Sequence, residues 1–219
     1  MPTLAAVAGR VLLALASVLA LVDWWAVRRS ALRVERFAKP ATMLALVAVA
    51  ATLGSAPAAV RWPLVIGAVL GLVGDIALLD DGETAFLTGL SAFAAGHLAY
   101  AVAATGVAFD PVWAIPGLVA MAALLAFRFA TRTVPGAVAD GGTVLGGAVV
   151  FYAAVISAMV VTAWATGAVV AGIGATLFAV SDWVLGHRRF VGPLPGGRLG
   201  VMIPYHVGQT LLIVGLATA

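Results

Sequence analysis

Long apolar runs separated by short polar breaks repeat along the whole chain. Each run has about 14–22 residues, close to the roughly 20 that a helix needs to cross a hydrocarbon core of about 30 Å. No stretch alternates apolar and polar residues with the period of two that is typical of membrane-embedded strands. The pattern predicts about eight transmembrane helices, at residues 11–27, 41–54, 63–79, 85–104, 112–127, 143–164, 168–186 and 199–217.

The composition agrees with this pattern. Of the 219 residues, 63% are hydrophobic and only 10% are charged, which predicts an all-α polytopic integral membrane protein. The connections are too short for a soluble domain, so we expect a single transmembrane helical domain, residues 1–219, with any site built between helices. The chain contains no cysteine, which excludes disulfides, thiol catalysis and thiolate metal ligands.

The basic residues predict the orientation in the membrane. Only Arg10 and Arg61 lie on one predicted side, and all the others fall in three connections on the opposite side: Arg28, Arg29, Arg33, Arg36, Lys39, Arg128, Arg132, Arg188, Arg189 and Arg198. Because Lys and Arg concentrate in cytoplasmic loops, we expect these connections to be cytoplasmic and both termini to lie outside, in a bacterial inner (plasma) membrane. The net charge of +3 is then a topology signal and gives no reason to expect a nucleic-acid partner.

Two acidic residues lie inside predicted spans. Asp75 and Asp182 each come about five residues before a basic or polar break, which places both about 7–8 Å inside the cytoplasmic boundary. An ionised carboxylate in hydrocarbon costs on the order of 2.5–3.5 kcal/mol, so each acid needs a partner or a cavity. Matching depth favours one shared site. Asp23 precedes Trp24 and Trp25, and we interpret it as an interface residue.

Other polar residues extend this site into a funnel that opens to the cytoplasm. The sequence Lys39-Pro40 predicts a helix start at the cytoplasmic edge. Helical rise places the remaining polar residues between that edge and the midplane. The candidate binding residues are Lys39, His97, Tyr100, Tyr205, His206 and Gln209. The far end of the funnel is apolar and suits a hydrocarbon chain.

Two further patterns concern helix packing. Gly67, Gly71 and Gly74 precede Asp75, and small residues at this spacing let a neighbouring helix approach closely. The Gly74-Asp75 region followed by His97-x-x-Tyr100 is echoed by Ser181-Asp182 followed by His206-x-x-Gln209. This echo predicts two four-helix halves related by a parallel repeat, with one acid from each half meeting at the centre.

Several motifs on successive spans resemble those of the YhhN-like transmembrane lysoplasmalogenases. The resemblance covers approximately residues 39–100 and 178–212. It is carried by Lys39-Pro40 with Met43, Gly71-x-x-Gly74-Asp75 with Leu78-Leu79, Phe86-x-x-Gly89-x-x-x-Phe93-x-x-x-His97-x-x-Tyr100, Ser181-Asp182 and Tyr205-x-x-x-Gln209.

The resemblance implies a lipid hydrolase that cleaves the vinyl ether bond of lysophospholipids in the membrane, giving a fatty aldehyde and a glycerophospho-alcohol, without a cofactor. This chemistry needs an acid, a base and an anion that stabilises an oxocarbenium ion. Two carboxyl groups in different environments can supply all three, so Asp75 and Asp182 are the catalytic candidates. The six binding candidates would position the ether and water, with Lys39 meeting the substrate phosphate.

Other interpretations stay open at this point. Paired intramembrane acids and glycine-rich helices also occur in proton-coupled transporters of small molecules, and a related lipid hydrolase could cleave another bond. The histidines could serve only as interhelical hydrogen-bonding groups. No compact spacing of ligands points to a metal site.

Overall fold

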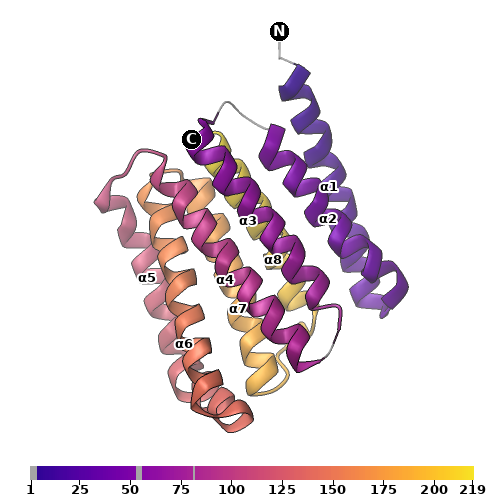
Figure 1. Ribbon diagram of the computed structural model, residues 1–219, viewed down its shortest axis with the longest axis vertical. Coiled ribbons are helices and arrows are strands. Elements are labelled where there is room, and N and C mark those ends of the chain that lie inside the picture. Colours follow the sequence, from indigo (N-terminus) through magenta and orange to yellow (C-terminus); the bar gives the residue numbers. More distant parts are fainter. Residues whose placement is uncertain (1–3, 53–55, 81) are drawn as a thin grey trace.

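The computed structural model describes residues 4–52, 56–80 and 82–219, which form a bundle of eight α-helices aligned along one long axis (Figure 1). No strand occurs within these ranges, so the all-α prediction is confirmed. The elements in chain order are α1 (Leu4–Arg29), α2 (Leu32–Thr52), α3 (Ala58–Ala77), α4 (Glu83–Thr105), η1 (Pro111–Trp113), α5 (Ala114–Leu124), η2 (Leu125–Thr133), α6 (Val134–Ala165), α7 (Val169–Phe190) and α8 (Leu199–Ala217).

Each predicted span overlaps one of these helices, but the described residues contain six segments that are long and apolar enough to cross a membrane. One of the six, Pro111–Ala165, includes both α5 and α6. The chain reverses between these helices in η2, where Phe127 and Arg128 have non-helical backbone angles (Figure 1). The helix α2 is not among the six, and residues 53 and 54 of the span predicted there lie outside the described residues. Eight crossings therefore remain a prediction.

The connection between α1 and α2 is shorter than the sequence suggested. Ser30, with φ of 53°, and Ala31 complete the turn, and α2 begins at Leu32. The expected helix start at Pro40 is wrong, because Pro40 lies inside α2. Charged residues continue the helix here, since long Arg side chains can extend from a helix to polar surroundings while their backbone groups stay hydrogen-bonded.

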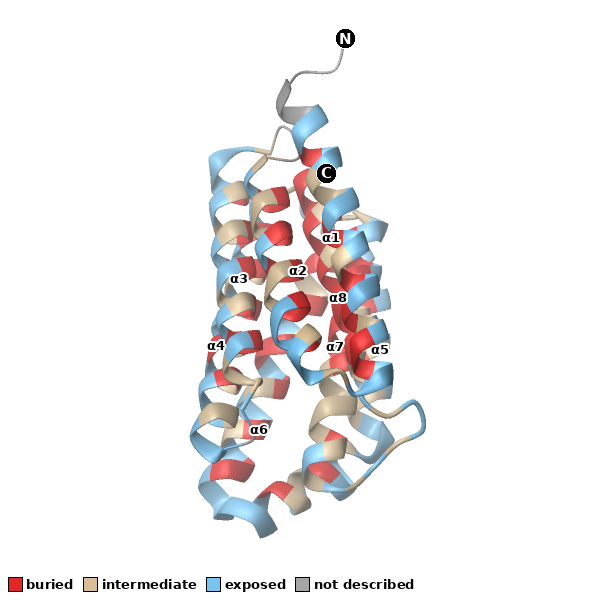
Figure 2. Ribbon diagram, turned by 90° about the vertical axis from the view of Figure 1, so that its right-hand side faces the viewer, coloured by how far each residue is buried: buried red, intermediate tan, exposed pale blue. Residues whose placement is uncertain are grey.

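Small residues bring α3 close to its neighbours, as the sequence predicted. A Cβ added at Gly67 would lie 2.6 Å from the Tyr100 ring, and one at Gly74 would lie 2.6 Å from the Phe93 ring. Buried residues face the interior of the bundle and exposed residues cover its outside (Figure 2). Many exposed residues are large and apolar, including Trp62 and Phe151, which fits a surface that contacts lipid.

The two ends of the bundle differ in charge. The α1–α2, α3–α4 and α7–α8 connections and η2 lie at one end, and both termini lie at the other (Figure 1). All the basic residues except Arg10 and Arg61 belong to the first end or to the helix turns next to it. The cavity described below opens at this basic end.

Candidate functional site

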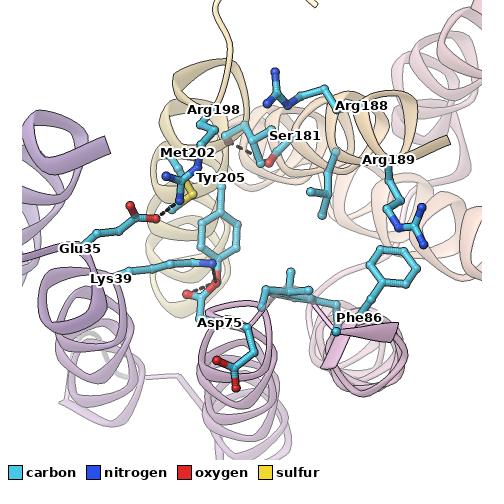
Figure 3. A pocket seen from close by; sticks show the side chains of 16 residues that line it. Glu35, Lys39, Asp75, Phe86, Ser181, Arg188, Arg189, Arg198, Met202 and Tyr205 are labelled. Carbon is cyan, nitrogen blue, oxygen red and sulfur yellow. Dashed lines mark hydrogen bonds and ion pairs between the residues drawn. The ribbon is translucent and has the colours of Figure 1, made fainter. Parts of the chain in front are cut away.

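A cavity of about 390 Å³ lies between α2, α3, α4, α7 and α8 at the basic end of the bundle. Its deeper wall carries Asp75 and Tyr205, whereas arginine and acidic side chains surround its mouth (Figure 3). Apolar side chains make up much of the remaining wall, namely Leu78, Phe86, Leu185, Val201 and Met202. The cavity therefore combines charged groups with surface that can contact a hydrocarbon chain.

Asp75 is held by two partners from other helices. Lys39 on α2 places Nζ 3.3 Å from one carboxylate oxygen of Asp75, and the Tyr205 hydroxyl donates a hydrogen bond of 2.8 Å to the other (Figure 3). The Asp75 side chain is 2% exposed and that of Lys39 is 9% exposed. Each carboxylate oxygen is thus satisfied, which meets the requirement for a charged group away from water.

This geometry corrects the expected position of Lys39. It lies inside α2 instead of at a helix start, and its ammonium group pairs with Asp75. Lys39 also lines the cavity, and its role in binding the substrate phosphate stays a prediction.

Tyr100 and Gln209 form a second buried pair deeper in the bundle. The Tyr100 hydroxyl donates a hydrogen bond of 2.6 Å to the Gln209 side-chain carbonyl. Gly71 makes room for this pair, because a Cβ at that position would lie 2.8 Å from the Gln209 amide nitrogen. Tyr205 is also close to Gly71, so the Tyr100–Gln209 pair lies directly behind the Asp75 cluster.

Asp182 belongs to a third cluster. One of its carboxylate oxygens accepts a hydrogen bond of 2.5 Å from the Tyr152 hydroxyl and lies 3.0 Å from His97 Nε2. The distance from His97 Nε2 to the Tyr152 hydroxyl is 2.9 Å, which closes a triangle of hydrogen-bonding groups. Tyr152 is not among the residues predicted from the sequence. Its signal was available, since the chain has three tyrosines and the other two were already candidates.

The two acids do not line one common cavity. Asp182 and Tyr152 line a smaller cavity of about 60 Å³, which adjoins that of Asp75. Four side chains line both cavities: Leu78, Phe86, Phe93 and Leu185.

His206 lies on another face of α8 from Tyr205. The Trp24 indole nitrogen donates a hydrogen bond of 3.1 Å to His206 Nδ1, and the ring lines a separate cavity between α1 and α8. His206 is therefore absent from the wall of the Asp75 cavity, contrary to the expectation from depth alone. Asp23, which we interpreted as an interface residue, is fully buried in this region, with an oxygen 4.0 Å from His206 Nδ1.

Charged side chains at the cavity mouth pair with one another in part. Arg198 contacts Glu35 in an ion pair, and Arg189 lies 2.8 Å from Asp140. Arg36 and Asp80 approach to 3.9 Å at the exposed rim, where an ion pair contributes little. Among the described residues, no group of three or more His, Asp or Glu side chains is arranged to hold a metal ion.

The fold and this cavity define the class, a multi-pass α-helical membrane protein with a polar cavity at one end. The family model of the YhhN family matches residues 34–216, and the chain belongs to this family. Two similar relatives are named lysoplasmalogenase TMEM86A. The protein from Homo sapiens is 31% identical over 161 residues, and that from Bos taurus is 29% identical over 160 residues.

Both alignments cover 71% of this chain and 65% of the relative, so the chain matches slightly less than two thirds of their length. No solved structure matches this fold.

Proposed function

We propose that this protein is an intramembrane hydrolase that cleaves the vinyl ether bond of lysoplasmalogens, such as lysoplasmenyl-ethanolamine or lysoplasmenyl-choline. Membership of the YhhN family and the names of the similar relatives support the substrate class. The observation that carries the proposal is the cavity at the basic end, in which a buried carboxyl group, Asp75, adjoins apolar side chains.

The reaction needs a proton donor, a proton acceptor and water. Transfer of a proton to the β-carbon of the vinyl ether converts its double bond to a single bond and leaves an oxocarbenium ion. Water adds to the α-carbon and gives up a proton, forming a hemiacetal. The hemiacetal then breaks its bond to the glycerol oxygen, which takes up a proton, and the fatty aldehyde departs. The sum of these steps is the addition of one water.

In this proposal Asp75 and Asp182 divide the acid and base roles between them. Each acid has a tyrosine hydroxyl and a basic side chain as partners, Tyr205 with Lys39 for Asp75 and Tyr152 with His97 for Asp182. These partners fix the carboxyl groups in one orientation, which reduces the reorganisation needed during proton transfer. Tyr100 and Gln209 support Tyr205 from behind.

The predicted parallel repeat gains support from the helices that supply these partners. Asp75 on α3 is contacted from α2 and α8, and Asp182 on α7 is contacted from α6 and α4. A rotation that exchanges the first four helices with the last four puts α7 in the place of α3, α6 in the place of α2, and α4 in the place of α8. Under the same exchange the packed pairs α3–α4 and α2–α3 correspond to α7–α8 and α6–α7, which are also packed. In this proposal each half contributes one acid.

Aldehyde release from lysoplasmenyl-ethanolamine by the purified protein in detergent tests the function. We expect release by the wild type and none from the corresponding alkyl-ether lipid, which lacks the vinyl group. Asp75→Asn and Asp182→Asn should each lower kcat by about 10²–10⁴-fold, since each removes a group that transfers a proton.

A matched control is Asp110→Asn, because Asp110 caps η1 away from the cavity and accepts a hydrogen bond from Val112 that Asn can also accept. This variant should keep wild-type turnover. Near-normal turnover by a folded Asp75→Asn or Asp182→Asn protein would contradict the two-acid mechanism, and absence of release from folded wild type would contradict the function.

A further inference from the structure

Arg188 differs from the other cations that line the Asp75 cavity. Lys39 pairs with Asp75, Arg198 with Glu35 and Arg189 with Asp140. Arg189 also stacks against the rings of Phe86 and Phe190. Arg188 has no ion pair, hydrogen bond or ring contact with any residue that the structure describes, although it is half-buried and lines the cavity.

Its place in the fold suits a group that enters from the membrane surface. Arg188 and Arg198 lie on the α7–α8 side of the cavity mouth, across from Asp75 on α3 (Figure 3). Along α7, Arg188 lies seven residues beyond Ser181 toward the mouth, a rise of about 10 Å. A ligand that reaches from the mouth to Asp75 can therefore contact this guanidinium group.

The chemistry of the residue indicates an anion with several oxygens. A guanidinium group can donate two parallel hydrogen bonds to a phosphate, and it is the usual choice where such a group must be oriented. In a lysophospholipid the glycerol unit separates the phosphate from the ether, so a phosphate at the mouth leaves the ether deeper in the cavity, toward Asp75.

We propose that Arg188 is the anchor for the phosphodiester of the lysophospholipid head group, and that Arg198 borders the same site. This inference rests on the proposed function, because it takes the ligand to be a lysophospholipid. Arg188 takes the place of Lys39 as the phosphate contact, because the Lys39 ammonium group pairs with Asp75. Arg188 thereby sets how deeply the lipid enters and favours phosphorylated lipids over neutral glycerol ethers.

Binding of two lipids that the enzyme does not cleave tests the anchor independently of hydrolysis. The probes are an alkyl-ether lysophosphoethanolamine and the alkylglycerol with the same chain and no phosphate, and intrinsic tryptophan fluorescence in detergent reports their Kd values. Wild type should bind the phosphorylated probe roughly 10-fold more tightly, as expected for a charge-assisted hydrogen bond. Arg188→Gln should reduce this preference to within about twofold and leave alkylglycerol binding unchanged.

Two further variants make the comparison specific. Arg188→Lys keeps the charge without the paired donors and should keep an intermediate preference. Arg28→Gln removes an exposed arginine of α1 that does not line the cavity, and it should bind both probes like wild type. Full preference in Arg188→Gln, or no preference in wild type, would overturn the inference.

Inorganic phosphate separates the two possible sources of the anion. If the site binds phosphate only as part of a lipid, about 10 mM inorganic phosphate should leave the Kd of the phosphorylated probe unchanged. A free phosphate ion lacks the hydrocarbon chain that holds the lipid in the cavity. Competition by phosphate alone would indicate a site for the free ion and contradict the lipid anchor. Aldehyde release is measured separately, so loss of the proposed function would not be confused with loss of the anchor.

Discussion

The Tyr152 hydroxyl contacts both Asp182 and His97. Among the residues that the structure describes, no other residue forms side-chain hydrogen bonds with both of them. The phenol donates to the carboxylate oxygen that also faces His97 Nε2. A donor in this position limits rotation of the Asp182 carboxyl group. In the proposed reaction we therefore expect Tyr152 to be a positioning residue that acts through Asp182.

Tyr152→Phe removes this donor and keeps the ring. In the lysoplasmalogenase assay we expect kcat to fall roughly 10-fold, the effect of losing one hydrogen bond to a charged group, with KM within about twofold of wild type. The unfolding temperature should change little, because the ring still packs against His97. A rise in KM at constant kcat would assign Tyr152 to substrate binding instead.

At the residue scale, the depth of a polar side chain along the bundle could be predicted from the sequence. The direction in which that side chain points around its helix axis could not. The regular rise of a helix placed Asp75, Tyr205 and Gln209 close together, and all three lie within one polar region. Successive helical residues point about 100° apart, however, so Tyr205 and His206 face different cavities. Which of them faces the acid depends on how α8 is rotated against its neighbours, and that requires the packing of all the helices.

At the element scale, backbone contact between α7 and α8 depends on glycine. A Cβ at Gly174 would meet the backbone nitrogen of Leu212, and one at Gly208 would lie 2.7 Å from the backbone nitrogen of Phe178. Because these atoms belong to the backbone, no side-chain movement could relieve the overlap. This close approach also fixes the relative position of α7, which carries Asp182, and α8, which carries Tyr205.

Gly174→Ala should therefore force α7 and α8 apart and destabilise the protein by about 1–3 kcal/mol. Thermal unfolding in detergent, followed by circular dichroism, measures the change. Gly147→Ala is the matched control, since Gly147 lies in α6 and a Cβ there would meet no atom within 4 Å. Equal unfolding temperatures for the two variants would show that the α7–α8 contact tolerates a methyl group.

The ends of the helices were harder to predict than their existence. Apolar runs indicated where α2 and α6 cross the bundle, but both helices begin earlier, at Leu32 and Val134. Hydrophobicity records the surroundings of the side chains, whereas a helix continues as long as its backbone hydrogen bonds form. The glycines at 141 and 142, which have non-helical angles, interrupt α6 close to the predicted start at residue 143.

At the scale of the whole molecule, charge and cavity share one end. The α1–α2 turn, η2 and the last turn of α7, which carry basic residues, lie at one end of the bundle (Figure 1). Arg188, Arg189 and Arg198 at this end line the Asp75 cavity. In a membrane, such residues favour the cytoplasmic side. If the bundle obeys this rule, the cavity opens to the cytoplasm, and we expect the proposed lysophospholipid substrate to enter from the inner leaflet with its phosphate at Arg188.

Single cysteines can test this orientation, because the chain has no cysteine of its own. Arg33 lies at the basic end and Ala108 in the connection after α4 at the other end, and both are exposed. In intact bacterial cells that express the protein, a maleimide that cannot cross the membrane should label Ala108→Cys and leave Arg33→Cys unlabelled until the cells are lysed. The reverse pattern would contradict the orientation and place the cavity mouth outside. Labelling of both variants in intact cells would mean that the two ends do not lie on opposite sides of one membrane.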